Sequence, residues 1–166
     1  MLEKELLIDG SYKKDRIGTA LLGKNPTVIS RVNSGFVFLM DRQFLLGWCI
    51  LTAYPQVFDL NVLPFGKRNE FLTDMHILGE AIALAVQPLR LNYSILGNTD
   101  NYLHAHVCPR YSCEELERLR KPAWVYPEKY WKDEEYEVSE KHLGIATQIR
   151  KNIADLYERH GIGRNG

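Results

Sequence analysis

The sequence predicts an α+β fold in which an antiparallel β-sheet of about five strands is covered by flanking helices. Two observations lead to this class. Short β-branched or aromatic runs alternate with turn residues, and two longer segments have helical periodicity. The expected order is a helix, several strands, a helix, two strands and a final helix. It contains too few strand–helix alternations for a doubly wound parallel sheet.

The composition narrows the kind of protein. Lys+Arg and Asp+Glu both number 21 among 166 residues, so no basic excess favours a nucleic-acid groove or an anionic membrane surface. The three cysteines lack CxxC spacing, which argues against a disulfide framework. No apolar run approaches the roughly 18 residues of a membrane span. We therefore expect one cytoplasmic domain over residues 1–166, with no nucleic-acid or membrane partner.

The first half of the chain is expected to hold a short helix followed by three strands. The helix is predicted over 13–22, where charged and apolar residues mix ahead of a Gly-Lys-Asn-Pro stop. The strands are predicted at 28–32, 36–40 and 48–52, because these runs are rich in β-branched and aromatic residues. A tight turn at 33–35 and a hairpin connection would join them into neighbours.

A change of period marks the next helix, which is expected from Arg68 to Pro88. Its apolar face is formed by Phe71, Met75, Leu78, Ile82, Ala85 and Leu89. A strand is predicted at 91–96, and a polar turn at 97–101 leads into a second strand, so that the pair makes a hairpin.

The C-terminal part differs in composition from the rest. After Arg110 a charged and aromatic segment is expected to wrap over the domain as an ordered connection. Ser139 is a suitable N-cap for a final helix that reaches about Tyr157, and residues 161–166 are expected to fray.

The most informative run is Tyr102-Leu-His104-Ala-His106-Val-Cys108-Pro-Arg110. Alternate side chains of a strand share a face, so Tyr102, His104, His106 and Cys108 would line one surface. The imidazole pKa of about 6.5 lets histidine act near neutral pH as nucleophile, acid/base or metal ligand. Three chemistries stay open on these residues: covalent catalysis, acid/base catalysis by both histidines, or metal ligation with Cys108 as third donor.

The stretch from Asn92 to Arg110 resembles the signature of the histidine triad (HIT) superfamily, which reads His-φ-His-φ-His-φ-φ, often followed by Pro-Arg, with φ apolar. The order of elements upstream supports the resemblance, which covers a HIT-like core over 27–111 and leaves 112–166 as a C-terminal wrapping segment and helix. Tyr102 stands where the family has its first histidine. His104 then matches the middle histidine and His106 the third.

The resemblance implies a hydrolase or transferase that acts at the α-phosphorus of nucleotide conjugates such as dinucleoside polyphosphates. His104 would be the nucleophile that forms a covalent nucleotidyl-histidine, and His106 would donate a hydrogen bond to the phosphate. The family implies no cofactor, a nucleotide substrate as partner and a homodimer.

The resemblance also implies binding roles for residues outside the histidine pair. Asp41 falls where the family contacts the ribose hydroxyls, and Asn98 and Thr99 where it contacts the phosphate or leaving group. Tyr102 can donate a hydrogen bond, but a phenol with a pKa of about 10 cannot shuttle protons as imidazole does. Tyr102 therefore also favours an alternative, a nucleotide-binding module whose catalysis has decayed.

Two further features have more than one interpretation. Arg110 either reaches a phosphate or is solvated or paired, as an arginine at a strand end usually is. The aromatic residues between Trp124 and Trp131 are expected to pack against the sheet rather than close over a site or a dimer seam.

Overall fold

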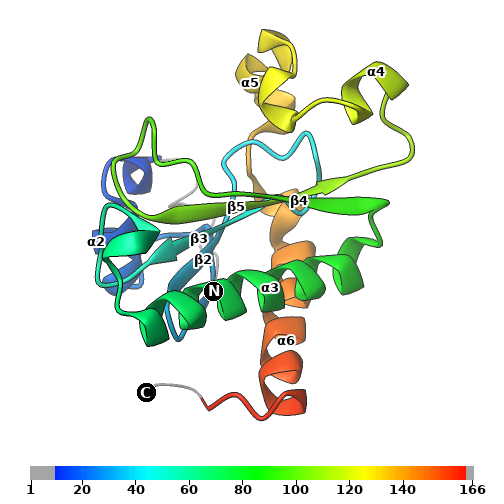
Figure 1. The fold of residues 1–166 in the computed structure, drawn as a ribbon. Coiled ribbons are helices and arrows are strands. Elements are labelled where there is room, and N and C mark those ends of the chain that lie inside the picture. Colours follow the sequence, from blue (N-terminus) through cyan, green and yellow to red (C-terminus); the bar gives the residue numbers. More distant parts are fainter. Residues whose placement is uncertain (1–9, 164–166) are drawn as a thin grey trace.

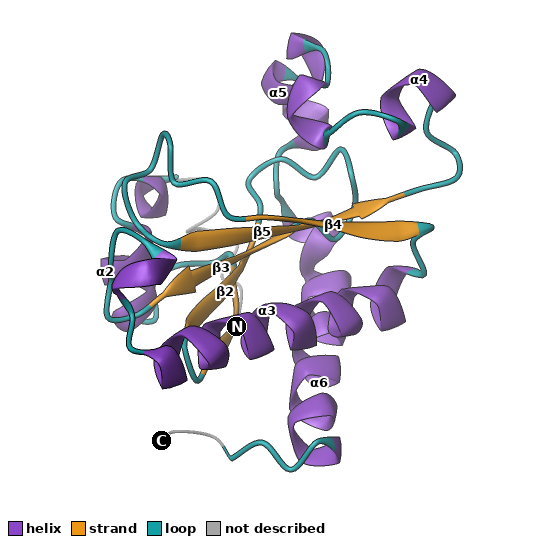
Figure 2. Cartoon of the chain, viewed as in Figure 1, coloured by secondary structure: helices purple, strands orange, loops and turns teal. Residues whose placement is uncertain are grey.

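The computed structural model describes residues 10–163 and contains a five-stranded antiparallel sheet in the order β1-β2-β3-β5-β4 (Figure 1). The strands are β1 (Val28–Val32), β2 (Gly35–Leu39), β3 (Cys49–Ala53), β4 (Arg90–Ser94) and β5 (His104–Arg110). Helices flank the sheet on both sides (Figure 2). The predicted α+β class with an antiparallel sheet of about five strands is confirmed.

Within residues 10–163, five α-helices accompany the sheet. They are α2 (Arg16–Leu21), α3 (Phe65–Val86), α4 (Leu116–Leu119), α5 (Glu128–Lys132) and α6 (Leu143–Arg159). No helix within residues 10–163 is long and apolar enough to cross a membrane. The fraying expected at 161–166 falls partly outside the described residues, since 164–166 are not among them.

One face of the sheet packs against the two long helices, α3 and α6, which lie together beneath it in Figure 1. Val37, Leu51 and Ala105 are neighbours across β2, β3 and β5 and are fully buried on this face. The period of two in these strands supplies the apolar face, because every second side chain points to the same side. The other side chains of the same strands must then face the opposite side.

A buried carboxylate fixes α3 and α6 to the hairpin of β1 and β2. Asp74 on α3 accepts hydrogen bonds of 2.7 Å from the backbone N–H and the hydroxyl of Ser34 in the hairpin turn. The hydroxyl of Tyr157 on α6 donates to the other carboxylate oxygen. Burial raises the pKa of Asp74, while these donors oppose the shift by stabilising the charged form.

The opposite face of the sheet is covered at its two ends by different segments. At one end Ile17 of α2 packs on Phe36 and Phe38. At the other end Ala123 and an aromatic group pack around Trp48 and Cys108. The chain after β5 therefore returns over the sheet, and α4 and α5 lie on the side away from α3 and α6 (Figure 1).

The expected position of Tyr102 inside the histidine strand is wrong, because β5 begins at His104. The backbone N–H of Tyr102 donates to the carbonyl of Asp100 at 2.8 Å, which closes a turn and keeps Tyr102 out of the β ladder. The backbone of Leu103 is already hydrogen-bonded on both sides. Its N–H donates to the carbonyl of Val57, and its carbonyl accepts from the N–H of Ala53. Tyr102 is thus held at the entrance to the strand.

Candidate functional site

The two histidines lie on one face of an inner strand, as the alternation predicts. β5 pairs with β3 on one side and β4 on the other, and the register places His104 beside Thr52, and His106 between Ile50 and Ser94. The ring centroids of His104 and His106 are 5.1 Å apart at 76°. Only 6% and 7% of these residues is exposed, so their rings have little freedom to move.

A single hydrogen bond sets the tautomer of His104. Its Nδ1 lies 2.8 Å from the backbone carbonyl oxygen of Tyr102. A carbonyl can only accept, so Nδ1 carries the proton of the neutral ring and donates it to this bond. The lone pair is then on Nε2, which makes no hydrogen bond to any residue from 10 to 163. His104 therefore presents an unprotonated nitrogen to an incoming electrophile.

His106 is kept neutral by its surroundings. Burial is the main cause that lowers the pKa of His106 to about 3, and repulsion from His104, when that ring is protonated, and from Arg16 adds to it. Its Nδ1 is buried without a hydrogen-bond partner among the described residues. The ring is enclosed edge-to-face by Trp124, with centroids 4.6 Å apart, and by Trp48 at 5.9 Å. Nε2 is the nitrogen left to meet a substrate.

Tyr102 lies against the first of these histidines. Its ring centroid is 5.1 Å from that of His104. Burial and the charge of Asp100 raise the pKa of the Tyr102 phenol. The hydroxyl is therefore protonated at neutral pH, where it can donate a hydrogen bond but cannot take up a proton.

Asp41 lies two residues after the end of β2, and it forms an ion pair with Arg16 of α2. Arg16 Nη2 donates to Asp41 Oδ2 at 2.7 Å, with the two side chains 14% and 26% exposed. The guanidinium also lies over the rings of Tyr12 and Phe38, 5.8 and 5.7 Å from their centroids. Its positive charge contributes to the lowered pKa of His106, after burial and His104.

Asn98 and Thr99 lie in the connection between β4 and β5 and are exposed. Neither side chain hydrogen-bonds to another residue in the range 10–163. The structure therefore brings Tyr102 and Arg16 near the histidines and leaves these two side chains in solvent. Their contact with a phosphate stays a prediction.

Every donor of the Arg110 guanidinium is used in a contact that stabilises the fold. Its guanidinium is fully buried and forms an ion pair with Glu114 at 2.8 Å. The remaining N–H groups donate to the side chain of Asn92 and to the carbonyls of Arg118 and Lys121. Arg110 therefore holds the C-terminal segment onto the sheet and has no donor left for a phosphate, so the paired interpretation is the one that applies.

The metal alternative finds no donor set. Within the described part of the chain, no three His, Cys, Asp or Glu side chains are placed to share an ion. Burial raises the pKa of the Cys108 thiol, which disfavours the thiolate that a metal would need. His104, His106 and Cys108 share a face of the strand but do not form such a group.

Comparison with solved structures identifies the architecture. A histidine triad protein from Bradyrhizobium japonicum matches with a TM-score of 0.62 at 16% identity, over 76% of this chain and 89% of that chain. A hypothetical histidine triad nucleotide-binding protein from Sulfolobus tokodaii matches with a TM-score of 0.62 at 14% identity, over 84% of this chain and 91% of that chain. This chain has the histidine triad fold. No family model and no curated protein matches the sequence.

Two contacts of this site have no local signal in the sequence. Arg16 reaches Asp41 only because α2 docks on β2, and a single arginine in a short helix carries no signal of that contact. Trp124 was expected to pack on the sheet, which it does, but it also touches His106. Its distance along the chain from the histidine run hides this contact.

Proposed function

We propose that this chain is a hydrolase or transferase that acts at the α-phosphorus of nucleotide conjugates such as dinucleoside polyphosphates. The observation that supports this most strongly is the hydrogen bond from His104 Nδ1 to the Tyr102 carbonyl, because it leaves the Nε2 lone pair free for attack. Similarity to histidine triad structures supports the same chemistry at the level of the fold.

In the first step His104 Nε2 attacks the α-phosphorus. A phosphorus–nitrogen bond forms, and the bond from phosphorus to the leaving group breaks. The leaving group departs with the electron pair and takes a proton from solvent. The imidazole becomes positively charged, and the Tyr102 carbonyl oxygen, which accepts the Nδ1–H hydrogen bond at 2.8 Å, stabilises that charge.

In the second step water attacks the same phosphorus. The phosphorus–nitrogen bond breaks, its electron pair returns to Nε2 and the water proton passes to solvent. Any other acceptor that carries an attacking oxygen or nitrogen would complete a transfer instead of a hydrolysis. His104 ends the cycle in the tautomer in which it began.

Donors around the histidines would stabilise the charge on the non-bridging oxygens. Neutral His106 would donate from Nε2, and the Tyr102 hydroxyl and the Arg16 guanidinium would add a neutral and a charged donor. Asp41 would bind the ribose hydroxyls while remaining paired with Arg16. Asn98 and Thr99 would contact the phosphate or leaving group from the loop that precedes β5.

A nucleotide-binding module without catalysis is the second candidate, and Tyr102 is the observation that favours it. A panel that contains a dinucleoside tetraphosphate and a nucleoside phosphoramidate separates the two. We expect the unmodified protein to release mononucleotide from at least one of them. Nucleotide binding by calorimetry without turnover, together with turnover gained in Tyr102→His, would instead support the module. Failure to bind or cleave any of them would contradict both.

We also propose that the chain forms a homodimer through the edge of the sheet at β4. This edge and the adjoining end of α3 carry exposed apolar side chains, an arrangement typical of an interaction surface. They are Leu84, Leu89, Tyr93, Ile95 and Leu96. Sedimentation equilibrium should give twice the mass of the chain, and a monomer at micromolar concentration would overturn this assignment.

A further inference from the structure

A cavity of about 490 Å³ opens beside His106 on the histidine face of the sheet. Its floor is formed by β4 and β5, and residues 119–124 form its far wall. Four of its lining residues are basic and none is acidic. They are Arg90, Arg110, Arg120 and Lys121. Since the whole chain has a formal net charge of zero, this local excess of positive charge distinguishes the cavity.

Two of the four cations are not neutralised. Arg110 and Lys121 are each paired with a glutamate at 2.8 Å. Arg90 and Arg120 are exposed and have no ion-pair partner among residues 10–163. The cavity therefore offers two free guanidinium groups to an anion, which is the group that binds phosphate with two parallel hydrogen bonds.

A row of donors on β4 runs along the cavity parallel to the histidine strand. The register pairs Ser94 with His106, Asn92 with Cys108, and Arg90 with Arg110, so these β4 side chains share the histidine face. From Ser94 to Arg90 the row spans roughly 14 Å at the rise of an antiparallel strand. The side-chain oxygen of Asn92 already accepts a hydrogen bond from Arg110. The N–H groups of the Asn92 side-chain amide are then left for a ligand. The row thus suits an extended anion that begins near His106.

The inner wall of the cavity contains buried polar atoms without partners. Trp48 is fully buried, and only 7% of His106 is exposed. Trp48 Nε1 and His106 Nδ1 have no hydrogen-bond partner in the described part of the chain. Buried polar groups are nearly always paired, so the unpaired N–H of Trp48 points to an acceptor in the cavity. His106 Nδ1 is the acceptor nitrogen when Nε2 carries the proton, so its partner would be a donor such as water rather than a phosphate oxygen.

We infer that this cavity is the leaving-group subsite of the proposed reaction and that it takes a leaving group built on a phosphate chain. The inference rests on the proposed function, since it places the reacting phosphorus at His104 and the departing phosphates beyond His106. The two histidine rings are 5.1 Å apart, which puts the cavity within reach of a group bonded to that phosphorus. An amine leaving group has no negative charge for Arg90 and Arg120 to bind.

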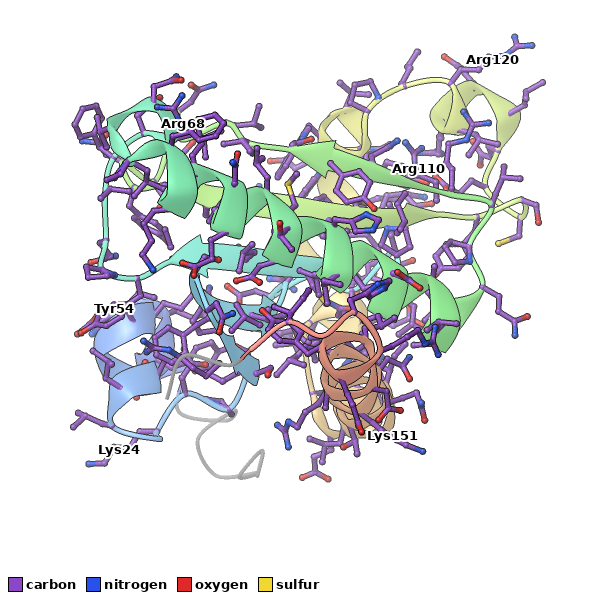
Figure 3. All side chains as sticks on the ribbon, turned by 60° about the horizontal axis from the view of Figure 1, so that its bottom comes forward. Lys24, Tyr54, Arg68, Arg110, Arg120 and Lys151 are labelled. Carbon is purple, nitrogen blue, oxygen red and sulfur yellow. The ribbon has the colours of Figure 1, made fainter. Side chains whose placement is uncertain are left out.

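Removing the two free charges tests this assignment. In the double variant Arg90→Gln, Arg120→Gln we expect kcat/KM for a dinucleoside tetraphosphate to fall by roughly 10- to 100-fold, because charge-assisted contacts are lost. For a nucleoside phosphoramidate with a neutral amine leaving group, we expect a change of less than about twofold. Lys24→Gln is the matched control, since Lys24 lies at the opposite corner of the molecule from Arg120 (Figure 3). Equal losses on both substrates, or no loss on either, would overturn the subsite.

A binding measurement separates the subsite from the proposed chemistry. All three tryptophans of the chain belong to the aromatic group beside the cavity, so intrinsic fluorescence reports on it. Inorganic tripolyphosphate should give a saturable change in the wild type and in His104→Gln, and at least a tenfold weaker one in the double variant. Saturable binding without turnover of any conjugate would leave the cavity as a polyphosphate-binding site and remove the proposed function. Turnover without such binding would remove the subsite and leave the proposed function standing.

Discussion

Replacing His104 with glutamine is expected to lower kcat by at least about a thousandfold on any conjugate that the wild type cleaves. Glutamine keeps a polar side chain of similar length but has no lone-pair nitrogen that can bond to phosphorus. The loss should appear in kcat rather than in nucleotide affinity, because the donors around the phosphate remain. Single-turnover release of mononucleotide measures it directly.

His76→Gln provides a matched control for this experiment. His76 is an exposed histidine on α3, on the side of the sheet away from the site, and its replacement should leave kcat unchanged within about twofold. A His104→Gln protein that folds and keeps more than about a tenth of wild-type turnover would contradict the assignment of His104 as nucleophile.

Acidification should destabilise this protein through His106. The pKa of His106 is lowered to about 3 in the folded protein and returns to about 6.5 on unfolding, so the unfolded state binds more protons between these values. Stability is therefore lost as the pH falls through this window, at about 1.4 kcal/mol per pH unit. Between pH 7.5 and pH 4.5 this residue alone should cost about 3 kcal/mol.

His106→Gln isolates that contribution, because glutamine does not titrate while the carboxylates titrate in both proteins. Urea unfolding at the two pH values should show that the wild type loses about 3 kcal/mol more than the variant. Equal losses would mean that His106 is not held neutral by burial. Because His106 is neutral above about pH 4, replacing it should not change how activity depends on pH in that range.

Local patterns were sufficient to predict the sheet and the face on which the histidines lie. The strand expected at 28–32 coincides with β1, since a β-branched run next to a tight turn specifies both the strand and its end. The shared face of His104, His106 and Cys108 followed from the period of two, and the register of β5 with its neighbours agrees with it.

The contacts that complete the site depend on tertiary structure, so the sequence could not predict them. Arg16 meets Asp41 because a helix docks on a strand, and Trp124 meets His106 because an irregular segment returns over the sheet. The partners of Arg110 come from this same segment, which has no period to interpret. Tyr102 was placed in the strand by alternation, which the turn at Asp100 overrides.

During turnover we expect a mononucleotide to become bonded to His104 Nε2. The most direct measurement is mass spectrometry of the wild-type protein quenched at alkaline pH while it turns over a dinucleoside tetraphosphate, since phosphorus–nitrogen bonds are labile in acid. We predict one nucleoside monophosphate on the peptide that contains His104, absent from His104→Gln. Turnover in which this peptide stays unmodified, or in which the adduct lies on another residue, would contradict the account.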